Sequence, residues 1–174
     1  MRLVKAALTF VYDELDFNPE LFEHEYHKLS QNDEDPIGQW LKGARARGET
    51  SESDPVLLNL LIELHRKIDG LEKIIKNEKP IRESLRFSGE IDAIGFENFT
   101  TNENVFEIGK MYYTRIEMLV HPKRDVPVIF EAIEPNLVKI VKMHEHDIKE
   151  WASYLTAQER ILIRAKRNEK EIVK

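Results

Sequence analysis

The sequence predicts an α+β protein: a small antiparallel β-barrel with a C-terminal helix, preceded by a long heptad helix and an N-terminal helical segment. Three observations lead to this fold class. Apolar residues recur with heptad spacing between residues 54 and 78. Short stretches of alternating apolar and polar residues, separated by turn sequences, then follow as far as Met143. From Asp147 to Glu171 the apolar spacing again favours a helix.

Residues 1–53 are predicted to form a mostly helical segment outside the barrel. Leu3–Tyr12 is apolar and fits either a helix or a strand. Asn18 and Pro19, followed by an acid, indicate a helix start. Ile37–Arg47 fits a short helix, whose Trp40 we expect in the core together with Trp151.

Residues 54–78 are predicted to form a helix that drives self-association. Asp54 is a good N-cap for this helix. The a and d positions of the heptads are Leu57, Leu61, Leu64, Ile68, Leu71 and Ile75. Isoleucine at a with leucine at d favours two parallel strands. Three more apolar residues lie at e and g, namely Leu58, Leu60 and Ile74. The stripe should therefore also bury against further helices or its own domain, and an ordinary amphipathic core helix is the alternative.

Residues 79–174 are predicted to contain the barrel and its closing helix. Met111–Val120 and Val126–Ala132 alternate as strands do, and Leu137–Met143 fits a short strand. The expected core residues are Phe87, Phe96, Ile116, Val128 and Phe130, with the closing helix. The basic run Arg160–Lys170 fits a solvated helix end or a contact with phosphates or a protein.

Composition excludes several classes of function. The net charge of −6 argues against general nucleic-acid binding, and the lack of cysteine excludes disulfides and thiolate chemistry. No apolar run approaches the length of a membrane span, so we expect no membrane insertion and a cytoplasmic location. The sequence has no phosphate-binding glycine loop and no nucleophile motif, so no enzyme and no catalytic residue is expected. His24 and His27 lack the spacing of a zinc helix, and no metal site is expected.

Three stretches of the sequence resemble the PilZ domain, a small bacterial β-barrel that in many proteins binds cyclic di-GMP. They read GEIDAIGFENF, FEIGKMYYTRIEM and ERILIRAKR. The resemblance covers about residues 56–168 and is closer to the atypical branch, which carries an oligomerising helix before the barrel. It implies a barrel fold, no cofactor, and cyclic di-GMP as the candidate ligand.

The resemblance also implies a set of nucleotide-binding residues. Arg82 and Arg86 match an R-x-x-x-R motif, whose arginines clamp phosphates. The family's second motif, Asp or Asn, x, Ser, x, x, Gly, aligns with Glu90 to Gly95 and has Asp92 in place of serine. Two carboxylates beside a ligand with two phosphate charges would cost on the order of 1 kcal/mol each. We expect Gly95 to serve the fold, by allowing a bulge or a close backbone approach.

The expected function is that of a PilZ-like regulatory protein. It would act as an oligomeric adaptor in bacterial cyclic di-GMP-linked signalling, with a protein partner in motility or surface-attachment machinery. The altered motifs favour an adaptor that does not itself bind nucleotide. The alternative is a true cyclic di-GMP receptor that uses Arg82 and Arg86.

Overall fold

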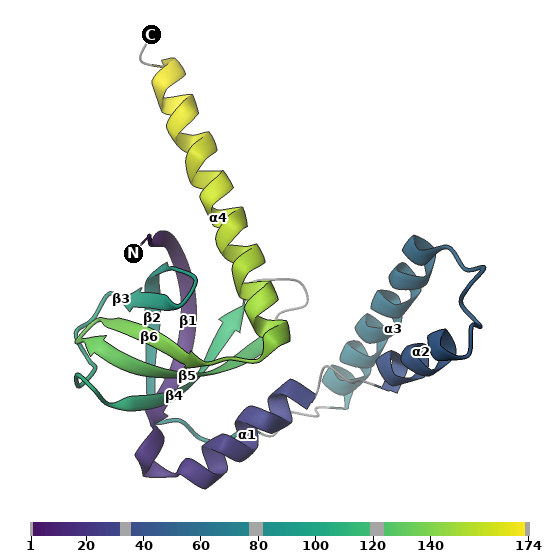
Figure 1. The fold of residues 1–174 in the computed structure, drawn as a ribbon, viewed down its shortest axis with the longest axis horizontal. Coiled ribbons are helices and arrows are strands. Elements are labelled where there is room, and N and C mark those ends of the chain that lie inside the picture. The colour runs from purple at the N-terminus through teal and green to yellow at the C-terminus, as the bar shows by residue number, and fades with distance from the viewer. Residues whose placement is uncertain (1, 32–35, 77–81, 119–123, 173–174) are drawn as a thin grey trace. The chain divides into compact units, whose positions relative to one another are not determined.

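The computed structural model describes residues 2–31, 36–76, 82–118 and 124–172 (Figure 1). The chain divides into two compact units. One combines the residues up to Leu29 with those from Glu83 onward, and the other runs from Ser30 to Arg82.

The first unit is a closed barrel of six antiparallel strands, as the fold class predicted. The strands are β1 (Val4–Glu14), β2 (Phe87–Ile94), β3 (Asn98–Thr101), β4 (Met111–Met118), β5 (Arg124–Glu134) and β6 (Leu137–Lys142). Around the barrel they follow the order β1-β2-β3-β6-β5-β4. The C-terminal helix α4 (Glu145–Ile172) follows the last strand, which confirms the predicted order of barrel and helix.

Strand β1 corrects the predicted domain boundaries. It pairs with both β2 and β4, so the barrel closes only with it, and the expectation that residues 1–53 lie outside the barrel is wrong. Its inward residues alternate from Val4 to Tyr12, as in any half-buried strand. Ala7 and Val11 on the outward side are apolar too, and they hide the alternation in the sequence. The predicted boundaries at residues 53 and 78 therefore differ from the observed division.

The barrel interior contains most of the expected core. Ile116, Val128 and Phe130 are fully buried, and Trp151 and Leu155 of α4 extend the same cluster. Two expectations are wrong: the side chains of Phe87 and Phe96 are exposed. Phe87 begins β2 opposite Tyr12 at the barrel rim, and Phe96 lies in the turn between β2 and β3.

Helix α4 is attached to the barrel through its first three turns. The indole Nε1 of buried Trp151 donates a 2.7 Å hydrogen bond to the backbone oxygen of Gly95. Asp147, where the apolar spacing placed the start of the helix, lies inside the first turn and forms a buried ion pair with Arg124. The second half of the helix extends away from the barrel (Figure 1).

Helix α1 (Pro19–Gln31) covers part of the outer barrel surface. It begins at the predicted proline, after a short 3-10 turn, η1 (Leu15–Phe17). Phe22 and Tyr26 of α1 pack against Tyr113 of β4 and Ile129 of β5. The outer face of β4 is therefore partly buried, although it belongs to the outside of the barrel.

The second unit contains helices α2 (Pro36–Ala46) and α3 (Pro55–Ile75). Asp54 caps α3 as expected, because its carboxylate accepts a 2.9 Å hydrogen bond from the backbone N–H of Val56. The helix has 21 residues and ends before the predicted residue 78; residues 77 and 78 lie outside the described part. Trp40 is exposed rather than in the core.

Candidate functional site

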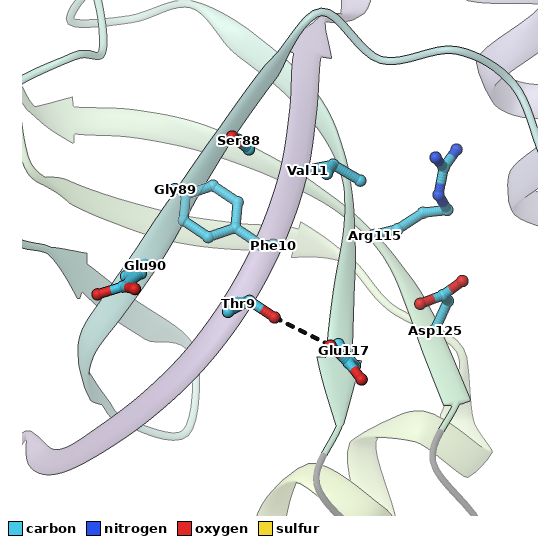
Figure 2. Close-up of a pocket in the computed structure, with 9 residues that line it drawn as sticks. All are labelled: Thr9, Phe10, Val11, Ser88, Gly89, Glu90, Arg115, Glu117 and Asp125. Carbon is cyan, nitrogen blue, oxygen red and sulfur yellow. Dashed lines mark hydrogen bonds between the residues drawn. The ribbon is translucent and has the colours of Figure 1, made fainter.

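The predicted signature strand, β2, borders a shallow depression on the outer barrel surface (Figure 2). Glu90 lies opposite Thr9 of β1 and points outward, whereas the neighbouring Ile91 is buried inside the barrel. The depression has a volume of about 350 Å³. Its lining residues are Thr9, Phe10, Val11, Ser88, Gly89, Glu90, Arg115, Glu117 and Asp125.

Acidic side chains dominate this depression. Glu90, Glu117 and Asp125 contribute three carboxylates, and the hydroxyl of Thr9 donates a 3.1 Å hydrogen bond to Glu117. Among the described residues that line it, the sole cation is Arg115. Figure 2 shows that its guanidinium is turned away from Asp125.

Arg115 is held by a buried network beneath α1. Its Nη1 donates to the carboxylate of Glu25 at 2.6 Å and to the backbone oxygen of Glu83 at 2.9 Å. The hydroxyl of Tyr113 donates to the same carboxylate at 2.8 Å. The side chains of Glu25 and Arg115 are 5% and 10% exposed, respectively. The positive charge of Arg115 is therefore already compensated inside the protein.

Arg86 is likewise bound to a buried acid. Its Nε donates to both carboxylate oxygens of Asp13, at 2.9 and 3.0 Å, and its backbone N–H donates to the same carboxylate. The Asp13 side chain is fully buried. Burial alone would raise the pKa of Asp13, but the hydrogen bonds and charge of Arg86 outweigh it and lower the pKa. The guanidinium also lies 3.8 Å from the ring centre of Phe17.

The remaining predicted nucleotide-binding residues divide between the two units. Arg82 is the last residue of the second unit and is half-buried, whereas Arg86 belongs to the barrel unit. Asp92 is half-buried on β2, two residues beyond Glu90. Gly95 does serve the fold: a Cβ there would lie 3.1 Å from the backbone oxygen of Arg2. This close approach is the role that the sequence predicted for the glycine.

These charges decide what the outer face of β2 can bind. A phosphate dianion would meet carboxylates on β2, and the charges of both Arg86 and Arg115 are already offset by a buried acid. The depression is better suited to a cationic or neutral polar group. Asp13 and Glu25 could not be identified from the sequence, because their partners are 73 and 90 residues away along the chain.

A second candidate site is the apolar face of α3. Its six a and d residues are each between 54% and 80% exposed. Ile62 is buried, and α2 contacts α3 in the same unit. Successive residues of an α-helix are turned by about 100°, which places the centre of the a and d face about 140° from Ile62. The side of α3 that carries Ile62 therefore differs from the exposed apolar side.

Three further findings concern metal binding, membrane spans and related proteins. Among the described residues, no group of three or more histidine, aspartate or glutamate side chains is arranged to hold a metal ion. None of the helices in the described ranges is both long and apolar enough to cross a membrane. Comparison of the chain with protein-family models, curated proteins and solved structures found no match.

Proposed function

We propose that the protein is a cytoplasmic, non-enzymatic adaptor that assembles through α3 and carries a PilZ-like barrel. The observation that supports assembly is the exposed heptad face of α3. The setting in bacterial cyclic di-GMP-linked signalling, and a partner in motility or surface attachment, rest on the resemblance of the sequence to the PilZ domain.

The a and d face of α3 is unusually apolar for a surface that is exposed to solvent. Of the residues that the structure describes between Ser30 and Arg82, the buried apolar ones are Leu41, Ala44 and Ile62. This core is small compared with the apolar surface that α3 exposes, which includes its a and d residues and also Val56, Leu60 and Ile74. Soluble monomers rarely expose a continuous apolar patch larger than a few hundred Å². Burial of this face against another molecule would remove the patch from water.

The spacing of the face supports a second copy of the chain as the occupant. Isoleucine at a and leucine at d favour a parallel pair of helices. In such a pair, a g residue faces the e residue five positions further along the other helix. Lys67 stands at g and Glu72 at e, so each Lys67 would face Glu72 of the partner subunit. This charge pairing supports the parallel arrangement.

The charges around β2 support an adaptor over a receptor. Arg86, one of the two arginines that a receptor would use, is bound to buried Asp13. Glu90 and Asp92 add negative charge along the same strand. A receptor would have to use an arginine whose charge already offsets buried Asp13, and drawing Arg86 away would leave that carboxylate without its cation, which is costly.

Cysteine cross-linking tests the proposed assembly, because the chain has no cysteine of its own. We expect Leu57→Cys at a d position to form a disulfide-linked dimer under mild oxidation, since a parallel pair in register brings this position to its own copy. Asn59→Cys is the matched control, because it lies at f on the same turn but outside the face. If Leu57→Cys forms no more dimer than Asn59→Cys, the parallel pair is wrong.

A further inference from the structure

The described segment of α4 from Arg160 to Asn168 lies beyond the contacts that attach the helix to the barrel. Leu155 is the last residue of the helix that the barrel buries, and every residue from Arg160 to Asn168 is exposed. This segment reads RILIRAKRN: it holds four cations and no acid in a chain of net charge −6. Ile161, Leu162 and Ile163 are exposed in the middle of it.

The helix places the three arginines of this segment on one side. Arg160, Arg164 and Arg167 follow spacings of four and three, so they lie within about 60° of one another around the helix. Leu162 is turned by about 170° from the centre of this arginine stripe. Lys166 lies about 40° from Leu162, so the guanidinium groups lie opposite a side that carries apolar residues and one lysine.

Contacts with the barrel hold the first turns of α4, from which this segment continues. Trp151 is hydrogen-bonded to the backbone of Gly95, and Arg124 forms ion pairs with both Asp147 and Glu150. These contacts attach the first turns of α4, and the arginine stripe follows on the same continuous helix. The stripe and the apolar side are thus presented to the outside on a helix that is anchored at its other end.

We propose that residues 160–168 of α4 bind the surface of an anionic phospholipid membrane. The helix would lie in the interface, with Leu162 and its neighbours among the headgroups and the arginines on lipid phosphates. Three consecutive apolar residues cover about 200° of the helix circumference. A groove on a protein partner would contact a narrower arc of the helix than this. Lipid molecules at a membrane surface can instead rearrange around all three side chains. Nucleic-acid phosphates would bind the arginines but leave the apolar residues in water.

Vesicle flotation with the full chain tests this proposal. We expect binding to phosphatidylcholine vesicles that contain phosphatidylglycerol, no binding to pure phosphatidylcholine vesicles, and loss of binding at high salt. Replacing Arg160, Arg164 and Arg167 with glutamine should weaken binding by roughly 100-fold, because each cation near the surface contributes about 5-fold. Replacing Leu162 with serine should also weaken binding, which distinguishes an interface from a purely ionic contact.

The matched control removes the same charge elsewhere. Replacing Lys5, Lys28 and Lys73, which are exposed on β1, α1 and α3, with glutamine should leave vesicle binding unchanged. The proposal is overturned if the wild type does not bind anionic vesicles at low salt, or if the lysine variant loses as much binding as the arginine variant. It is also overturned if the arginines are required for binding to a nucleic-acid duplex but not for binding to vesicles. If a variant fails to fold, the salt and lipid dependence of wild-type binding still tests whether the chain binds anionic vesicles.

Discussion

Replacing Glu25 with alanine should strongly destabilise the barrel unit. The carboxylate of Glu25 accepts hydrogen bonds from Tyr113, Arg115 and the backbone of Glu83. It thereby connects α1, β4 and the segment that leads into β2. The substitution leaves the guanidinium of Arg115, whose side chain is only 10% exposed, without its counter-charge.

The size of the effect follows from these contacts. Removing one partner of a buried ion pair typically costs about 3–5 kcal/mol, because the other charge stays buried. The unpaired hydroxyl of Tyr113 adds to this cost, although contributions within one network do not simply sum. We therefore expect the free energy of unfolding to fall by about 4 kcal/mol. Glu23→Ala on the same helix is the control: its pair with Lys142 is 41% exposed on both sides and should contribute less than about 1 kcal/mol.

Urea unfolding followed by fluorescence measures this difference. Trp151 is buried in the barrel, so a Trp40→Phe background assigns the signal to the barrel unit. Arg115→Ala should cost less in the Glu25→Ala variant than in the wild type, because the pair is already broken there. A loss below about 1 kcal/mol for Glu25→Ala, or no coupling between the two substitutions, would refute the reasoning.

Three further predictions concern single residues and the candidate ligand. The pKa of Asp13 is lowered in the folded state, so its ionised form stabilises the fold above its unfolded pKa of about 3.9, and this contribution is lost as pH falls through the lower folded value. The difference in unfolding free energy between the wild type and Asp13→Asn should therefore shrink below pH 4, as measured by urea unfolding at several pH values. Gly89→Ala should destabilise by about 1–3 kcal/mol, because its Cβ would lie 2.9 Å from the buried ring of Phe10. Gly70→Ala has open space in α3 and should instead stabilise by about 0.5–1 kcal/mol; thermal melts compare the two. Calorimetric titration with cyclic di-GMP should give no binding heat, since Arg86 is bound to Asp13; saturable binding that Arg86→Ala abolishes would restore the receptor alternative.

The sequence predicted those parts of the fold whose pattern is local. The alternation of β4 and β5 assigned Ile116, Val128 and Phe130 to the interior, and the cap at Asp54 located the start of α3. Strand β1 could not be assigned, because apolar residues on its outward side removed the alternation. Its neighbour β2 lies more than seventy residues further along the chain, and short-range patterns carry no information on such pairing.

From the sequence, only the strand that carries the candidate site could be predicted, and not the contacts of its side chains. Glu90 and Asp92 lie on a barrel strand as the resemblance implied, and Gly95 has the close backbone contact that we expected of it. The pairing of Arg86 with Asp13 could not be predicted, because the sequence gives no sign of which acid approaches which arginine. The spacing of an R-x-x-x-R motif does not tell whether its arginines are available to a ligand.

The mass of the full chain in solution tests the central claim most directly. Sedimentation equilibrium at tens of micromolar should give a multiple of the 20.5 kDa chain mass. Leu64→Asp combined with Ile68→Asp should give the monomer mass, because the assembled α3 face would bury unpaired charges at a cost of several kcal/mol. Asn59→Asp combined with Lys73→Asp places acids at f positions of the same helix and should leave the assembled mass unchanged. A wild type that sediments as a monomer, or an assembly that survives aspartates at Leu64 and Ile68, would contradict assembly through α3.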